Sequence, residues 1–267
     1  MVEEISKEKF DEKIEADSFD DAITKEYENL KDEDLIFPEQ SLCSYLNVTS
    51  APVISYRYAI YLLKESEIIN QNILNVACGT GEEAVILAKK GANVFASDIS
   101  PISVRVAQKR ACLNSVADRI HAEVMSVYNL KFPDASFKYI YGNACLHHFD
   151  LEKAILEMYR VLKPGGIGIF REPVGNSRIL QKIRDFIPIK KDIVSPNERQ
   201  LTYEDINIIK TVFKNVVVKE FGLFIRLNRI IKNEKINAFI YKIDNILLEK
   251  FPYLRKYSCR VVIQFIK

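Results

Sequence analysis

A glycine turn of the kind that holds a nucleotide or an amino-acid carboxylate lies in the sequence NVACGTGEEA, residues 75–84. Gly79 and Gly81 follow a short apolar run and directly precede a helical pattern. Glycine permits close backbone approach and positive φ, and a helix N-terminus offers free N–H groups with partial positive charge. The turn therefore suits an anionic ligand group, although strand–helix connections without a ligand also use glycine in this way.

Asp98 ends the next apolar run, 17 residues after Gly81. In a parallel sheet an acidic residue at that point lies beside the glycine turn and can accept hydrogen bonds from both hydroxyls of a ribose. The alternative is that Asp98 only caps the helix that follows. Together the turn and Asp98 favour an adenosine-containing cofactor, and NAD is one that would fit.

Three further titratable side chains follow later strands. His147 and His148 come just beyond the apolar run 137–142, and Glu172 ends the run 167–172. Imidazole titrates near neutral pH, so either histidine could act as a general base, and we place His148 first. Glu172 could orient a substrate or act as the base, because strand carboxyl ends meet at one crevice. The alternative is that one histidine packs structurally and the other caps the next helix.

The elements that must position these residues alternate along the chain. Apolar runs bounded by turn residues predict strands at 73–77, 93–97, 120–126, 137–142, 167–172, 215–221 and 259–266. Helical spacing predicts helices at 56–63, 82–90, 101–114, 151–162, 176–187, 203–213 and 224–250. We expect N-caps at Ser100, Asp150 and Thr202, and loops over 35–52 and 188–200. This alternation predicts parallel βαβ units with right-handed crossovers, an α/β fold.

Composition excludes several classes of protein. The net charge of +2 gives no general case for nucleic-acid binding. Five scattered cysteines without a C-x-x-C pair argue against a disulfide framework and a zinc site, so we expect no metal and a reducing, cytoplasmic location. The start of the chain lacks a signal-peptide pattern, and no apolar run is long enough to span a membrane. Charge is unevenly spread: residues 1–34 carry 14 Asp/Glu and 5 Lys, whereas residues 223–256 carry 8 Lys/Arg and 3 Asp/Glu.

Two further runs favour one family. NLKFPDASFKYIYGNACLHHF (129–149) and RVLKPGG (160–166) resemble the type-11 methyltransferases, which include quinone- and sterol-modifying enzymes. FDDAITKEYENL (19–30) resembles the family's N-terminal arm, which folds over the cofactor. The resemblance covers about residues 73–172 and implies S-adenosylmethionine (SAM) as cofactor. It also implies a Rossmann-like, seven-stranded, mostly parallel sheet with helices on both faces and an antiparallel last strand.

The resemblance also implies roles for individual residues. The methionine part of SAM would contact Ala77, Cys78, Gly79 and Gly81. Asp98 would hold the ribose, while Ile99 and Val127 would border the adenine. Asn143 and Ala144 would lie near the sulfonium. Ser126 departs from the family pattern, since many relatives have an aspartate there that accepts from the adenine amino group, and serine accepts more weakly.

These features predict methyl transfer from SAM to a small molecule, at oxygen. The rival functions are an NAD-dependent oxidoreductase, which RVLKPGG and LHH disfavour, a protein or RNA methyltransferase, and a non-catalytic SAM-binding protein. The absence of an N-P-P-Y-like segment after residue 142 weakens a nucleic-acid substrate. The acceptor molecule and the oligomeric state stay open.

We expect an N-terminal helical arm or cap over residues 1–55 and a methyltransferase domain over 56–267, with a helical lid inserted at about 224–256. The apolar stripe of that insertion comprises Leu227, Ile231, Ile236, Phe239, Ile240, Ile243, Ile246 and Leu247. One interpretation is that this stripe faces the protein and walls the substrate cleft. The other is that it lies on a membrane surface. We favour the first, because an exposed stripe favours aggregation.

Overall fold

A computed structural model describes residues 2–27, 31–46, 52, 54–175, 200–225, 227 and 231–267. The predicted helix at 176–187 and nearly all of the predicted loop at 188–200 lie outside these residues.

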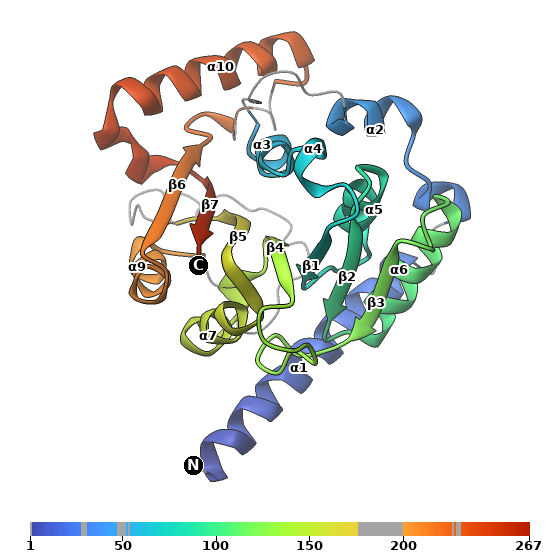
Figure 1. Ribbon diagram of the computed structural model, residues 1–267. Coiled ribbons are helices and arrows are strands. Elements are labelled where there is room, and N and C mark those ends of the chain that lie inside the picture. The colour runs from blue at the N-terminus through green and yellow to red at the C-terminus, as the bar shows by residue number, and fades with distance from the viewer. Residues whose placement is uncertain are drawn as a thin grey trace.

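The centre of the molecule is one seven-stranded sheet (Figure 1). In spatial order its strands are β3 (Ile120–Val124), β2 (Asn93–Asp98), β1 (Asn72–Val76), β4 (Phe137–Asn143), β5 (Leu162–Pro173), β7 (Arg260–Ile266) and β6 (Asn215–Phe221). Neighbours from β3 to β5 pair in parallel, and β7 runs antiparallel to both β5 and β6. The predicted sheet, with its antiparallel last strand, is confirmed.

Helices cover both faces of the sheet, as the apolar strands require. In β1, Ile73 and Leu74 are fully buried but belong to different core clusters, because successive side chains point to opposite faces. The Ile73 cluster contains residues of α3 (Ser55–Leu62), α5 (Glu82–Lys89) and α6 (Pro101–Leu113). The Leu74 cluster contains residues of α7 (Leu151–Val161) and α9 (Tyr203–Val212).

Two of the three predicted helix caps are confirmed. The Ser100 hydroxyl accepts from Ser103 N at 2.9 Å, and Pro101 occupies the first turn of α6. Thr202 caps α9 in a capping box with Asp205. The prediction for Asp150 is wrong: α7 does begin after it, but its side chain makes no cap hydrogen bond and instead lies 3.3 Å from the Lys153 ammonium.

The N-terminal segment forms one long helix, α1 (Val2–Tyr27), which packs against α6. Short elements follow it: a 3-10 helix η1 (Asp32–Leu35), α2 (Glu39–Leu46) and, after α3, α4 (Glu65–Ile68). A helix at α2 contradicts the loop expected over 35–52. The reason is that Leu42 and Tyr45 pack against the core and support a helix there.

The segment between β6 and β7 differs from its prediction. The helix begins only at Glu234, where the Asn233 side chain accepts from Lys235 N and Ile236 N, and it ends at Lys250 as α10. A 3-10 helix, η4 (Pro252–Tyr257), follows α10. No helix among the described residues is long and apolar enough to cross a membrane.

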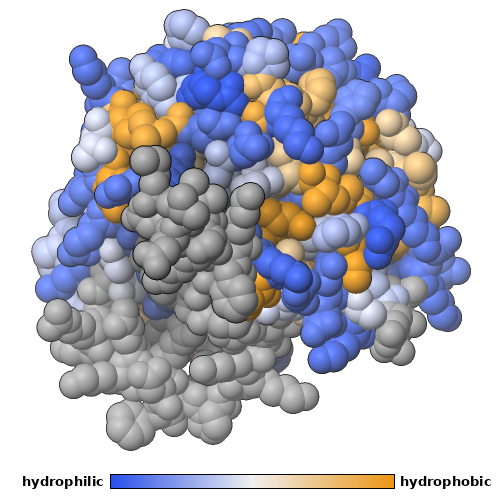
Figure 2. Space-filling model, turned by 90° about the horizontal axis from the view of Figure 1, so that it is seen from below, coloured by the Kyte–Doolittle hydropathy of each residue, from blue (hydrophilic) through white to orange (hydrophobic). Residues whose placement is uncertain are grey.

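The expectation that the apolar stripe faces inward is wrong for much of α10. Ile236, Phe239 and Ile246 are exposed, and no residue of α10 lines the cavity described below. The physical reason is that α10 lies at the edge of the sheet against β6 and η4, so only one side of it is covered. On the face in Figure 2, the described hydrophobic residues form separate patches among hydrophilic ones.

Candidate functional site

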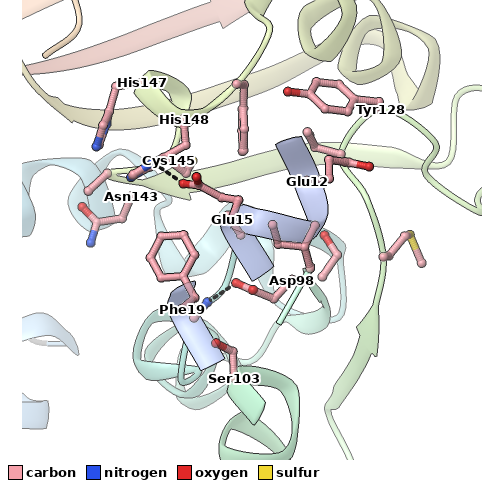
Figure 3. Close-up of a pocket in the computed structure, with 18 of the residues that line it drawn as sticks. Glu12, Glu15, Phe19, Asp98, Ser103, Tyr128, Asn143, Cys145, His147 and His148 are labelled. Carbon is pink, nitrogen blue, oxygen red and sulfur yellow. Dashed lines mark hydrogen bonds and ion pairs between the residues drawn. The ribbon is translucent and has the colours of Figure 1, made fainter. Parts of the chain in front are cut away.

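A cavity of about 590 Å³ lies at the carboxyl ends of β1, β2 and β4, with α1 across it (Figure 3). The segments after these strands and after β3 contribute most of its lining, and α1 contributes four residues, Glu12, Glu15, Phe19 and Ile23. Of the predicted site residues, those that line it are Ala77, Gly79, Asp98, Ile99, Val127, Asn143, Ala144, His147 and His148. Cys78, Gly81, Ser126 and Glu172 do not line it.

The two glycines of the turn have different tasks. Both have positive φ, +50° at Gly79 and +81° at Gly81. A Cβ added to Gly79 would meet no atom within 4 Å, so the cavity reaches the backbone there. A Cβ added to Gly81 would lie 2.8 Å from the Ala107 Cβ. Gly81 therefore allows α6 to pack against the turn; it does not line the cavity, and its contact with a ligand stays a prediction.

Asp98 ends β2, and its carboxylate is hydrogen-bonded to the backbone of the glycine turn. Its Oδ2 accepts from Gly79 N at 2.8 Å, and its Oδ1 accepts from Ser100 N at 3.0 Å. Burial raises the pKa of the Asp98 carboxyl, and the backbone hydrogen bonds oppose that shift. Each carboxylate oxygen has a second lone pair, so ligand hydroxyls could bond to it as well.

Ser126 meets a carboxylate that comes from far away in the sequence. Its hydroxyl is hydrogen-bonded to the Glu12 carboxylate of α1, and it also accepts from Tyr128 N at 3.1 Å. Glu12 lines the cavity, whereas Ser126 lies behind it. Sequence reasoning missed Glu12, and the only signal was the acidic character of residues 1–34.

Each of the two histidines faces a carboxylate. His147 Nδ1 lies 2.8 Å from Glu172 Oε2, and Glu172 Oε1 accepts from Cys145 N and Leu146 N at 2.9 and 3.0 Å. Glu172 is fully buried, so the expectation that it faces the crevice is wrong: these three hydrogen bonds hold it behind His147. His148 Nδ1 lies 2.7 Å from Glu15 Oε1 of α1, and the two imidazole centres are 4.1 Å apart.

Asn143 is fixed by a polar network that the sequence did not suggest. Its amide nitrogen donates to Glu83 Oε1 at 2.7 Å, and its oxygen accepts from Arg171 Nη1 at 2.9 Å. Arg171 also donates to Ser55 Oγ at 3.1 Å. Burial raises the pKa of Glu83, which lies in the first turn of α5. The network leaves the Asn143 side chain little freedom at the cavity wall.

Comparison with known proteins agrees with this geometry. Residues 74–170 match the family described as "Methyltransferase domain". The ubiquinone/menaquinone biosynthesis C-methyltransferase UbiE of Rickettsia bellii is 33% identical over 170 residues, 58% of this chain and 68% of that protein. The 27-O-demethylrifamycin SV methyltransferase of Amycolatopsis mediterranei is 32% identical over 48% of this chain and 50% of that protein.

The fold itself is shared with solved structures. Phosphoethanolamine N-methyltransferase 2 of Haemonchus contortus, in complex with SAM, superimposes with a TM-score of 0.56 at 19% identity, covering 93% of this chain and 60% of that one. The chain spans between 27% and 54% of the length of several other curated relatives that it matches. By its sequence motifs, its sheet and these relatives, the chain belongs to the type-11 family of class I, SAM-dependent methyltransferases.

Proposed function

We propose that this chain transfers a methyl group from SAM to an oxygen atom of a small molecule. The observation that carries the proposal is the pair of His147 and buried Glu172 at the cavity that Gly79 and Asp98 also border. The open space at Gly79 supports a cofactor fit, because it lets a ligand approach the backbone of the turn closely.

In this proposal the loops after β1, β2 and β3 would hold the cofactor. The turn at Ala77 and Gly79 would hold the methionine part, and Asp98 would accept from the ribose hydroxyls. Ile99 and Val127 would border the adenine. Asn143, which is held in place by Glu83 and Arg171, and Ala144 would lie near the sulfonium.

Glu12 supplies the carboxylate that Ser126 lacks. The family resemblance implies an aspartate at the position of Ser126, where it would accept from the adenine amino group. Here the Glu12 carboxylate reaches Ser126 from α1 and borders the cavity beside Val127. An ionised acceptor makes a stronger hydrogen bond than a hydroxyl, so Glu12 takes over that role when α1 covers the cavity.

His147 is the proposed base, in place of His148. The bound cofactor supplies an electrophilic methyl on a sulfonium, so the protein must align an acceptor and remove its proton. With Nδ1–H donated to Glu172, the lone pair of His147 is on Nε2, which takes the hydroxyl proton. Glu172 then stabilises the imidazolium, because a buried carboxylate 2.8 Å away offsets the new charge. His148 is instead paired with α1 through Glu15.

A second candidate is methyl transfer to carbon, which the name of the Rickettsia bellii relative states for that protein. Deprotonating a phenol activates both its oxygen and the neighbouring ring carbons, so His147 would serve either reaction.

We also propose a cytoplasmic location, which the free thiols at Cys43, Cys78, Cys112, Cys145 and Cys259 support.

The test has two stages. Isothermal titration should show binding of SAM and S-adenosylhomocysteine but not of NAD, and NAD binding without SAM binding would refute the proposal. Incubation with SAM and either catechol or hydroquinone should then give an O-methyl product by NMR. A C-methyl product would assign the second candidate. Tight SAM binding without transfer to any acceptor of a wider phenol panel would favour a non-catalytic SAM-binding protein.

A further inference from the structure

One side of α10 exposes large apolar residues. Phe239 is 64% exposed, Ile246 51% and Ile236 47%. Their spacing of three and seven residues places them on one side of the helix, with the half-buried Ile243 between them. These four residues form what we call the outer face of α10. Isolated exposed apolar residues are ordinary, but a row of them along one helix marks an interaction site.

The rotation of α10 about its axis is fixed by contacts on its opposite side. Leu248 and Asp244 are buried, and the Asp244 carboxylate accepts from Phe224 N at 3.1 Å. Leu248 follows Phe239 by nine residues, which is about half a turn around a helix of 3.6 residues per turn. Since Leu248 faces the protein, Phe239 must point away from it. Figure 1 shows α10 along the outside of the molecule.

The charges beside the outer face are mostly basic. Lys235 and Lys242 are exposed on the flank of the face, and Lys250 is exposed at its end. Of the acidic residues of α10, Glu234 is exposed in the first turn, Asp244 is buried and Glu249 lies 3.9 Å from Lys219. A second copy of the same face would bring lysines against lysines, which disfavours self-association. Anionic lipid headgroups complement both the charge and the apolar row.

We propose that the outer face of α10 docks on the surface of an anionic lipid bilayer, with Ile236, Phe239 and Ile246 among the upper acyl chains and the lysines at the headgroups. The helix lies in the plane of the surface and does not cross it. This proposal does not depend on the methyl-transfer proposal.

The test is co-sedimentation of the full chain with vesicles of phosphatidylcholine alone and of phosphatidylcholine with phosphatidylglycerol. We expect binding only to the anionic vesicles, weakened by salt. F239S should weaken binding roughly tenfold or more, the scale of withdrawing one large apolar side chain from lipid. The matched control is L156S on α7, which removes a 58% exposed apolar residue elsewhere and should leave binding within about twofold.

The charge contribution has its own variant. K235E/K242E should weaken binding to anionic vesicles while leaving the melting temperature unchanged, because both lysines are exposed. Absence of binding to anionic vesicles would overturn the proposal, and so would equal losses in F239S and L156S. Sedimentation velocity without lipid gives the remaining outcome: a dimer that F239S dissociates would assign the face to a second copy instead.

Discussion

At the scale of single residues, the acidic groups around the cavity differ in what already binds them. Asp98 accepts hydrogen bonds from two backbone N–H groups, those of Gly79 and Ser100. Glu12 instead contacts one hydroxyl, on Ser126, and reaches it only because α1 lies across the cavity. The contribution of Glu12 to binding can therefore be removed without disturbing the sheet.

We predict that Glu12→Gln weakens the binding of SAM by about 1–2 kcal/mol, because a neutral hydrogen-bond acceptor replaces a charged one. The inosine analogue of S-adenosylhomocysteine has a carbonyl in place of the adenine amino group and should gain from the substitution relative to the adenosine form. Titration calorimetry with both ligands measures this. The double variant Glu12→Gln/Ser126→Asp should restore the preference for adenosine. An unchanged ratio of the two affinities in Glu12→Gln would show that Glu12 does not face the amino group.

Glu83 allows a prediction about pH. Burial raises its pKa above the usual 4.5, so the folded chain holds this proton more tightly than the unfolded chain does. The stabilisation from Glu83 is then fully present below pH 4.5 and is lost as pH rises through the raised pKa. Glu83→Gln keeps an acceptor for Asn143 and removes the buried charge.

We therefore expect Glu83→Gln to raise the melting temperature at pH 7 by about 2–4 °C, equivalent to about 1 kcal/mol, with the gain shrinking toward pH 4. Thermal unfolding followed by circular dichroism across this pH range is the measurement. Glu152→Gln is the matched control, since Glu152 is an exposed acid in the first turn of α7 and its replacement should change little. If the melting temperatures of Glu83→Gln and the parent differed by the same amount at every pH, that result would contradict a raised pKa at Glu83.

At the scale of elements, the turn between β1 and α5 shows how two glycines of one motif separate. Gly79→Ala should cost about 1–2 kcal/mol of stability for its positive φ, and it should abolish most SAM binding because the new Cβ points into the cavity. Gly81→Ala should cost about 1–3 kcal/mol beyond the φ penalty, because its Cβ meets Ala107. Gly165→Ala is the control for φ alone: Gly165 has φ +71° and open space around it, and it does not line the cavity.

Calorimetric titration with SAM and thermal unfolding separate these effects. The expected pattern is lost affinity with modest destabilisation at Gly79, and marked destabilisation at Gly81. Equal SAM affinities in Gly79→Ala and Gly165→Ala would remove the steric argument for a ligand at the turn.

The elements were predictable to the extent that their signals are local. β2 was expected at 93–97 and spans Asn93–Asp98, because a buried parallel strand is a continuous apolar run between turn residues. β5 was expected from 167 but begins at Leu162, since its pairing with β4 starts before the glycines, and that pairing is a tertiary contact. The periodicity of α10 predicted a helix but not which side is covered, because apolar residues occur on more than one side of it.

In the candidate site, too, the features with local sequence signals were predictable. The turn, Asp98 and the histidines lie where the alternation of strands and helices places them, at strand carboxyl ends. Other features depend on residues 25 to 114 positions apart in sequence. They are the burial of Glu172 and Glu83 and the hydrogen bond between Glu12 and Ser126. Such contacts leave no mark on a single sequence.

At the scale of the whole molecule, α1 closes the cavity and is attached to the domain at the N-terminus of α6. The Asp20 carboxylate accepts from the Ser100 hydroxyl and from Ile102 N at 3.2 Å, at the positive end of the α6 dipole. Farther along, Arg110 donates to the Tyr27 hydroxyl at 3.2 Å. Glu12, Glu15 and Phe19 reach the cavity from the same helix. The hydrogen bonds of Asp20 therefore also help to hold α1 across the cavity.

We predict that Asp20→Ala loosens α1 and weakens the binding of SAM by about 1–2 kcal/mol, although Asp20 does not contact the cofactor. The reason is that a loosened α1 must become ordered when SAM binds. By linkage, SAM should protect α1 from trypsin in the parent and much less in Asp20→Ala. Limited proteolysis at the lysines of α1, with and without SAM, measures this alongside calorimetry. Asp17→Ala is the matched control, because Asp17 is an exposed acid on the same helix that should leave both readouts unchanged. If Asp20→Ala binds SAM as tightly as Asp17→Ala does, α1 covers the cavity without contributing to the affinity for the cofactor.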